Sequence, residues 1–391
     1  MTLPLTGIKI LDFSTLLPGP YATQLLADMG AEVLRVESPT RPDLVKFMPP
    51  NVGGVSAAHA SLNRNKQSIA IDLKHAQAQE IIHKLVKDYD IIIEQFRPGV
   101  MQRLGLDYET LKQKQTKLIY CSITGYGQTG PLKDRAGHDI NYLALSGLAS
   151  YSGRKETGPV LSGTQIADIA GGSHHAVMAI QAAIIQRAVT GEGQYLDISM
   201  SDAALALTTM FGASALAGGQ TPALGSEMLN GGLFYDYYET ADGRYLSLGS
   251  LEPVFATKVL KALDMTNWMP KLADQRPEAQ KEVREKLSEV FKQQTLAHWV
   301  ALFDPLDACV EPVLSLDEAF EHPHFKARGM ITSAVNTKGE HMTQLNSALP
   351  FESDKKFKVG TNLGADTACV LENMGYSQAD INQLKASKCV K

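Results

Sequence analysis

Residues 8–37, IKILDFSTLLPGPYATQLLADMGAEVLRVE, contain the pattern that decides the fold. Two apolar runs of strand length enclose a segment with helical periodicity, and the breaker residues Pro18-Gly19-Pro20 separate the first run from that segment. A strand, a helix and a strand in this order indicate a βαβ unit with parallel strands. The predicted elements are a strand over 8–13, a helix over 21–29 and a strand over 32–37.

The same alternation continues through the first half of the chain. We therefore predict an α/β fold with a Rossmann-like parallel sheet. The turn after the first strand reads TLLPGP, so the GxGxxG fingerprint of dinucleotide-binding proteins is missing there. The further predicted elements are strands over 68–73, 90–94, 118–123 and 194–199, and helices over 75–87 and 168–189.

A second, smaller α/β domain is predicted after Gly218. The segment GGQTPALGSEMLNGG has the composition of a linker, and the residues on both sides of Ala241-Asp242-Gly243 predict a β-hairpin. After about His322 we expect a loop-rich chain, with a last helix capped by Ser377. The predicted domains are a large domain over 1–217, a linker over 218–229, a small α/β domain over 230–319, and a linker and C-terminal segment over 320–391.

Composition excludes several classes of function. The chain has 391 residues, with 37 Lys and Arg against 42 Asp and Glu, and its net charge is −5. This balance does not favour nucleic-acid binding. No apolar run reaches the length of a membrane span, and no basic leader is seen, so we expect a cytoplasmic protein without membrane insertion. We expect neither a metal site nor a disulfide framework, because four cysteines are scattered without CxxC pairs: Cys121, Cys309, Cys369 and Cys389.

Polar residues at predicted helix starts are the candidates for chemistry. His138 precedes an apolar helical run in GHDINYLALSG, with Asp139 as its expected cap. The positive end of a helix keeps an imidazole neutral and able to accept a proton. Asp168 begins a predicted helix in LSGTQIADIAGG, and Glu252 precedes a proline that suits a first helical position. Each of the three is equally explained as a helix-end residue without a chemical role.

The glycines after Asp168 bear on this choice. Gly171 and Gly172 have no side chain, so they allow another backbone or a ligand to approach the Asp168 helix closely. We interpret them as a sign that a ligand packs here.

Several long segments closely resemble the α-methylacyl-CoA racemases, which belong to the family III CoA-transferase superfamily. They are GHDINYLALSG, the Asp168 segment, TGEGQYLDISM, NGGLFYDYYETADGRYLSLGSLEP and DACVEPVLSLDEAF, and the resemblance runs from about Leu5 to Leu384. It implies a Rossmann-like large domain that binds coenzyme A, a small α/β domain, and a C-terminal segment that returns to the large domain. It also implies an interlocked homodimer, with the active site between the large domain of one chain and the small domain of the other.

The resemblance assigns roles to particular residues. It places His138 and Asp168 on the two catalytic acid/base positions, and Glu252 on the residue that hydrogen-bonds the histidine. Lys74 and Arg97 suit phosphate groups, with plain surface charge as the alternative. The implied coenzyme A contacts are Ile71, Asp72, Leu73, Lys74, Arg97, Gly137, Asp139, Ile140, Asn141 and Tyr142; Arg41 is expected to replace an arginine that the family often has where this chain has Ser38.

The implied activity is that of a racemase, an isomerase of fatty acid metabolism that epimerises C2 of 2-methyl-branched acyl-CoA thioesters by 1,1-proton transfer. Coenzyme A is part of the substrate, and no separate cofactor is expected. Inversion needs a base on one face of the carbon and an acid on the other. Because free His and Asp have pKa values of about 6.5 and 3.9, their sites must bring these values closer. Glu252 would favour protonated His138, and burial against the ligand would raise the pKa of Asp168.

The alternative is a family III CoA-transferase that moves CoA between carboxylic acids. In that mechanism Asp168 attacks the thioester and carries the acyl group as a mixed anhydride. His138 and Glu252 favour the racemase, because the anhydride mechanism needs neither. A third possibility, an acyl-CoA-binding protein without chemistry, predicts a missing acid/base residue, and none is missing.

Overall fold

The computed structural model describes residues 2–272, 277–351 and 357–391. By its internal contacts the chain forms two compact units. The larger unit consists of residues 1–146, 162–207 and 324–391, and the smaller unit of residues 147–161 and 208–323. The domain bounds proposed from the sequence stay a prediction.

A six-stranded sheet forms the centre of the larger unit, and all of its neighbouring strands are parallel. Numbered by their sequence, the strands lie in the order of a Rossmann fold, with the reversal of strand order between the first and fourth. This confirms the predicted α/β fold with a Rossmann-like sheet. Across the sheet the strands are β10 (Tyr195–Ser199), β7 (Ile119–Thr124), β6 (Ile91–Glu94), β1 (Lys9–Asp12), β2 (Glu32–Glu37) and β5 (Lys66–Ala70).

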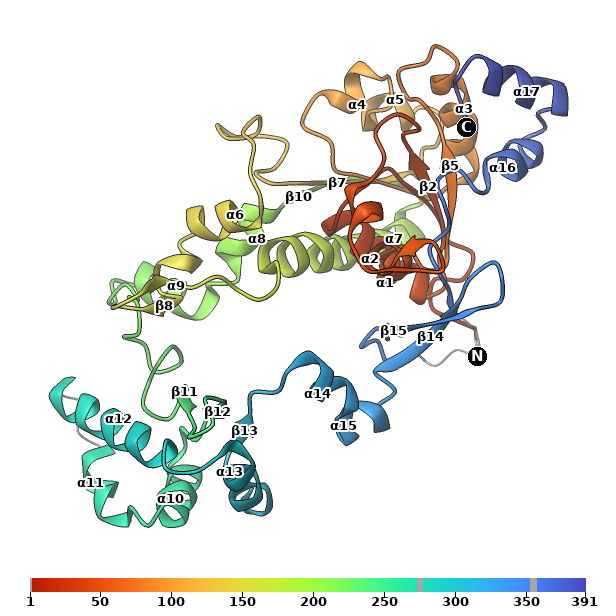
Figure 1. Ribbon diagram of the computed structural model, residues 1–391. Coiled ribbons are helices and arrows are strands. Elements are labelled where there is room, and N and C mark those ends of the chain that lie inside the picture. Colours follow the sequence, from red (N-terminus) through yellow and green to blue (C-terminus); the bar gives the residue numbers. More distant parts are fainter. Residues whose placement is uncertain (1, 273–276, 352–356) are drawn as a thin grey trace. The chain divides into compact units, whose positions relative to one another are not determined.

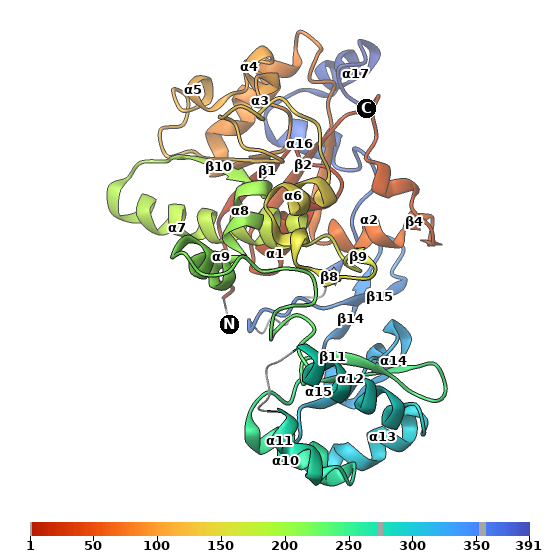
Figure 2. The same cartoon turned by 90° about the vertical axis from the view of Figure 1, so that its left-hand side faces the viewer.

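Both faces of this sheet are buried, which explains its continuous apolar strands. Successive residues point to opposite faces, so Ile10 packs in the cluster under α1 and α7, whereas Leu11 packs in the cluster under α3. Figures 1 and 2 show helices on both sides of the sheet. One side carries α1 (Pro18–Asp28) and α7 (His175–Thr190); the other carries α3 (Ala78–Leu85), α4 (Val100–Arg103) and α5 (Tyr108–Leu111).

The first helix begins three residues earlier than predicted. Pro18 and Pro20 lie inside the first turn of α1 rather than before it. First-turn residues have no intrahelical acceptor for their N–H groups, so a proline costs nothing there.

The predicted helix over 168–189 consists of two parts. Residues Ala167–His174 form a π-helix, η4, and α7 follows without a break until Gly191, whose φ of 77° ends it. The interpretation of Gly171 and Gly172 as a ligand-facing pair is wrong. A Cβ on Gly171 would lie 3.1 Å from the Met200 carbonyl oxygen, and one on Gly172 would lie 3.0 Å from Pro18 Cβ, so both glycines serve close packing within the protein.

The expectation of a loop-rich chain after His322 is also wrong. Strands β14 (Ile331–Val335) and β15 (His341–Leu345) form an antiparallel pair, and β14 also pairs with β16 (Phe357–Lys358). The last helix, α17 (Gln378–Ala386), has the predicted Ser377 cap, whose side chain accepts from the Asp380 N–H. The remaining elements of the larger unit are β3 (Asn51–Val52), β4 (Val55–Ser56), α2 (Ala57–Leu62), α6 (Asp139–Leu145), α8 (Met200–Ala206), α15 (Pro323–Ala327) and α16 (Thr367–Asn373).

The smaller unit contains the predicted hairpin. Strands β11 (Asp236–Glu239) and β12 (Tyr245–Leu248) are antiparallel, and β12 also pairs with β13 (Val310–Pro312). The elements are β8 (Gly153–Arg154), β9 (Gly158–Pro159), α9 (Thr209–Leu216), α10 (Pro253–Ala262), α11 (Met269–Leu272), α12 (Pro277–Phe291), α13 (Leu296–Phe303) and α14 (Leu316–Glu321). In neither unit does a described helix have the length and apolar character needed to cross a membrane.

Candidate active site

Most of the predicted site residues follow strands of the parallel sheet. Residues 71–74 follow β5, Arg97 follows β6, residues 137–142 follow β7, and Arg41 follows β2. Because the carboxyl ends of parallel strands lie at one edge of a sheet, the fold brings these segments to the same edge of the larger unit.

The turn between β1 and α1 differs from a dinucleotide-binding turn. Pro18 and Pro20 remove two backbone donors from the first turn of α1, and the N–H of Gly19, between them, donates to Gln95 Oε1 at 3.0 Å. A helix N-terminus binds phosphate through free N–H groups, so this one is poorly suited to a pyrophosphate. The sequence TLLPGP thus stands where a glycine-rich fingerprint would lie, and the Gly19 N–H of this turn is bonded within the protein.

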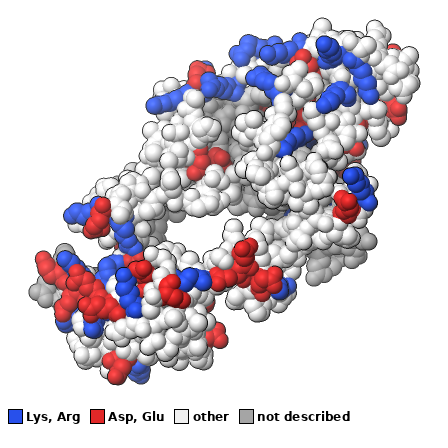
Figure 3. Space-filling model, viewed as in Figure 1, with Lys and Arg blue, Asp and Glu red and all other residues white. Residues whose placement is uncertain are grey.

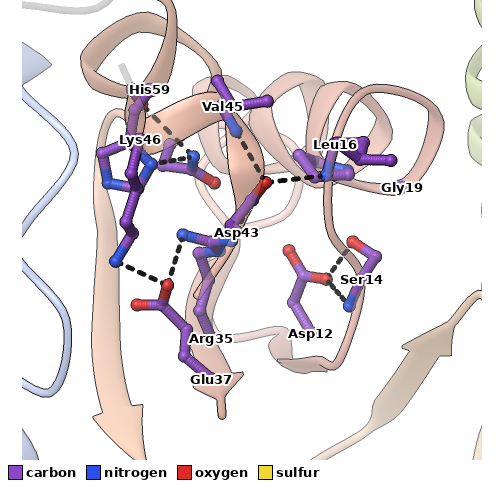
Figure 4. Close-up of polar contacts among 12 residues, drawn as sticks. Asp12, Ser14, Leu16, Gly19, Arg35, Glu37, Asp43, Val45, Lys46 and His59 are labelled. Atoms are coloured by element: carbon purple, nitrogen blue, oxygen red, sulfur yellow. Dashed lines mark hydrogen bonds and ion pairs between the residues drawn. The ribbon is translucent and has the colours of Figure 1, made fainter. Parts of the chain in front are cut away.

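A buried ionic network fixes this turn from the side of β2 (Figure 4). Asp43 accepts the backbone N–H of Leu16 at 3.2 Å and the Arg35 guanidinium at 3.0 Å. Arg35 also contacts Glu37 at 3.2 Å, and Lys46 contacts the same carboxylate at 2.7 Å. Leu16 has a φ of 62°, which is unusual for a residue with a branched side chain. The network therefore holds a strained turn at the sheet edge where the candidate site lies.

His138 is the N-cap of α6, and its own N–H donates to Asn141 Oδ1 at 3.0 Å. The preceding residue is held by Tyr142, whose hydroxyl donates to the Gly137 carbonyl at 2.6 Å. A Cβ at Gly137 would lie 2.7 Å from the Tyr142 ring and 2.8 Å from the Tyr126 hydroxyl, so only glycine fits. The His138 side chain is exposed, and the residue before it is packed against two tyrosines.

The sequence predicted that Asp139 caps its own helix, and this prediction is wrong. The Asp139 Oδ1 accepts the backbone N–H groups of Ala167, at 2.6 Å, and Asp168, at 3.1 Å. These are the first donors of the π-helix η4. The carboxylate therefore joins the start of α6 to the start of η4, and His138, at the start of α6, acts electrostatically on Asp168.

The electrostatic setting of Asp168 follows from this arrangement. Burial, followed by the neighbouring Asp139 charge, raises the pKa of Asp168 to about 6, against a smaller lowering by His138. Burial within the protein therefore acts on this pKa in the direction predicted for burial against a ligand, and the effect of a ligand stays a prediction. A carboxyl group of this pKa is close to an ordinary imidazole, at about 6.5, in its tendency to give up a proton.

Glu252 belongs to the smaller unit. It is the N-cap of α10, with Pro253 at the first helical position as predicted, and its side chain is exposed. Pro253 lines a cavity of about 1090 Å³ within that unit. The pairing of Glu252 with His138 stays a prediction.

The predicted coenzyme A contacts differ in exposure, and Asp72, Leu73 and Asp139 are half-buried. Lys74, Arg97 and Arg41 are exposed, whereas Ile71 is fully buried and forms a backbone bridge with Val390. Ser38 accepts the Arg41 N–H at 3.1 Å, which shapes the turn that presents Arg41. Figure 3 shows Lys and Arg side chains gathered over the part of the larger unit that carries α3, α4 and α5. The exposed cations suit phosphate groups, and the Ile71 side chain can only support the segment from inside.

A cavity of about 280 Å³ beside Arg97 was not foreseen from the sequence. Glu94, at the end of β6, lies on its wall, and burial raises the pKa of this carboxyl to about 7. Tyr195 donates to Ser122 at 3.0 Å in the same wall. The run EQFRPG gave no signal for this cavity, because Tyr195 and Ser122 come from other strands. Over the described ranges, no three or more His, Cys, Asp or Glu stand together where they could hold a metal ion.

The fold and the site define a Rossmann-like α/β protein in which an imidazole acts electrostatically on a half-buried carboxyl group. The model of CoA-transferase family III matches residues 5–367. The chain therefore belongs to CoA-transferase family III.

Relatives within the family have different activities. The chain is 35% identical over 399 residues to the human (Homo sapiens) alpha-methylacyl-CoA racemase, covering 99% of this chain and 97% of the relative. It is 34% identical over 405 residues to the human succinyl-CoA:glutarate CoA-transferase, covering 99% and 90%. Among solved structures, a CAIB/BAIF family protein from Brucella suis is similar with a TM-score of 0.84 and 30% identity, covering 96% of this chain and 100% of that chain.

Proposed function

We propose that this protein is a racemase that epimerises the C2 centre of 2-methyl-branched acyl-CoA thioesters by 1,1-proton transfer. The observation that supports it most is the pairing of His138 with Asp168. The two groups act on each other electrostatically, and the pKa of Asp168, at about 6, is close to that of an ordinary imidazole. A carboxyl group with a pKa near neutrality can both take and give a proton near neutral pH.

The proposed chemistry assigns one face of C2 to each group. For one epimer Asp168 takes the C2 proton and protonated His138 gives a proton to the opposite face. For the other epimer neutral His138 takes the proton and protonated Asp168 gives one. The thioester supplies an acidic C2 proton, and the electron pair is held as the enolate between the two transfers.

The coenzyme part of the substrate is proposed to lie along the carboxyl edge of the sheet. Lys74 and Arg97 are exposed cations that would meet its phosphates, since the first turn of α1 offers few free donors. The family likeness adds a homodimer and the bond from Glu252 to His138 to this proposal. A cytoplasmic location is proposed from the scattered cysteines, which fit a reducing compartment.

The second candidate is CoA transfer, because relatives at 34% identity are CoA-transferases. Here an Asp168 oxygen would attack the thioester carbonyl, the carbon–sulfur bond would break and CoA thiolate would leave, giving an aspartyl anhydride. This mechanism gives no role to the imidazole of His138. We place it second for that reason.

One incubation separates the two candidates. A single epimer of a 2-methylacyl-CoA is incubated with the enzyme in heavy water without an acceptor acid. We expect deuterium at C2 together with approach to a mixture of both epimers, followed by mass spectrometry and chiral chromatography. No exchange across several branched thioesters, with CoA transfer once glutarate or succinate is added, would contradict the racemase and support the transferase.

A further inference from the structure

The carboxylate of Asp139 is the feature that the proposed chemistry leaves without a role. It lies between the two proposed acid/base residues, directly after His138 in sequence and bonded to the backbone N–H of Asp168. Its Oδ1 takes two donors at once, from Ala167 and Asp168. Backbone N–H groups at a helix start have no partner within the helix, so an external carboxylate at this place stabilises the helix and its dipole.

We propose that Asp139 is a positioning residue for Asp168, which fixes the start of the π-helix and places a second carboxylate beside the Asp168 carboxyl. The inference rests on the proposed function, since it concerns how the acid/base pair is matched. It assigns the Asp139 side chain a task within the protein in place of the predicted contact with coenzyme A.

The position of Asp168 depends on this contact because the helix behind it has little else at its start. The residue before η4, Ile166, has no side-chain cap. Ser173 donates to the Pro18 carbonyl at 2.7 Å and to the Asp168 carbonyl at 3.2 Å, so its hydroxyl holds carbonyl groups and leaves the N–H groups at the start of the π-helix to another acceptor. Asp139 supplies the missing cap from a separate helix.

The charge of Asp139 has a second consequence. A like charge disfavours the ionised form of a carboxyl group, so Asp139 holds the pKa of Asp168 higher than burial alone would. The charges that act on the Asp168 carboxyl are those of Asp139 and His138, while Pro18 of α1 and Met200 of α8 lie against Gly172 of the same π-helix. Asp202 on α8 and Asp197 on β10 are acidic residues of the other packed elements. The titratable groups around Asp168 are His138, Asp139 and Tyr142 on α6, and, on its own helical run, His174 beside the Tyr21 ring and His175 on the Ala170 carbonyl.

The pH profile reports this charge. Conversion of either epimer requires that Asp168 and His138 together hold one transferable proton. One epimer needs the carboxylate with the imidazolium, and the other needs the carboxylic acid with the neutral imidazole. The plot of kcat/KM against pH should therefore be a bell with the same two apparent pKa values for both epimers. Without the Asp139 charge the pair loses protons more easily, so both limbs of the bell should move to lower pH.

The experiment compares Asp139→Asn, Asp139→Ala and a matched control, Asp202→Asn. An asparagine oxygen can still accept the two N–H groups, so Asp139→Asn should move the bell by about one pH unit to lower pH, the size expected of a nearby charge in a half-buried site. Hydrogen exchange of a peptide that spans residues 166–174 should stay slow. Asp139→Ala should also speed that exchange and lower kcat by about 10-fold or more, because the start of η4 loosens.

Asp202 stands in the first turn of α8, and its charge acts on Asp197 rather than on Asp168. Asp202→Asn should leave both the bell and the exchange unchanged. An unmoved bell in Asp139→Asn, or unchanged exchange in Asp139→Ala, would overturn the inference. Failure of the proposed function is a different result, since the wild-type enzyme would then not exchange the C2 proton at all, while the hydrogen-exchange comparison would still test the cap.

Discussion

Replacing Asp168 with Asn should slow the interconversion of the two epimers by about 10³-fold, and replacing His138 with Ala should do the same. Each substitution removes the only acid/base group proposed for one face of C2, and such groups typically contribute 10²- to 10⁴-fold. Both directions of the reaction must suffer equally, because each direction uses one group as base and the other as acid. The measurement is the initial rate of epimerisation from each pure epimer.

The control for this prediction is stability. Asp168 is half-buried beside the like charge of Asp139, so Asp168→Asn removes a repulsion and leaves the size of the side chain unchanged. The midpoint of unfolding in urea should therefore stay the same or rise, as is common for groups held in a strained site for function. Near wild-type epimerisation by a well-folded Asp168→Asn protein would show that the carboxyl group has no part in proton transfer.

Replacing Asp43 with Ala should lower the free energy of unfolding of the larger unit by about 3–5 kcal/mol, the cost of removing one partner of a buried ion pair. The Asp43 side chain is 1% exposed and that of Arg35 is 2% exposed. Without Asp43 the Arg35 guanidinium keeps its ion pair with Glu37, a carboxylate that also contacts Lys46. The backbone N–H of Leu16 loses its acceptor as well.

An exposed pair provides the comparison. Glu80 and Lys84 are 67% and 46% exposed, and they form an i,i+4 pair on α3, so Glu80→Ala should cost less than about 1 kcal/mol. Urea unfolding followed by fluorescence and circular dichroism measures both variants. Equal losses for the two variants would mean that the buried network does not hold the turn between β1 and α1.

The same network shows how burial and charge compete. Burial alone raises the pKa of Glu37, but Arg35 and Lys46 more than offset this, and the pKa lies below its ordinary value. Glu37 therefore stays ionised, and its charge helps to keep two cations at the carboxyl end of β2.

The strands of the larger unit could be predicted because a parallel sheet buried on both faces needs continuous apolar runs, and Ile91, Ile92 and Ile93 form such a run without interruption. The β11–β12 hairpin was equally readable from the Asp242-Gly243 turn. Strands β14 and β15 were missed because they mix polar and apolar residues, as strands with one exposed face do. Such short alternating runs look like loop when read alone.

The contacts of the candidate site were harder to predict from the sequence, because they join segments that are distant along the chain. Asp139 looked like the cap of the helix that follows it, since local rules consider only the next few residues. Its true partners, Ala167 and Asp168, come 28 and 29 residues later. The π-helix was also not predicted, because apolar periodicity in a sequence does not separate a short π-helix from an α-helix.

The central claim is that His138 and Asp168 serve opposite faces of C2, and one measurement tests it most directly: deuterium uptake at C2 of each pure epimer by the two single variants in heavy water. An enzyme that keeps one base can still exchange the proton on the face of that base without inverting the centre. Asp168→Asn should therefore label only one epimer, with its configuration kept, and His138→Ala only the other. Labelling of the same epimer by both variants, or of both epimers by either one, would contradict the assignment of one residue to each face.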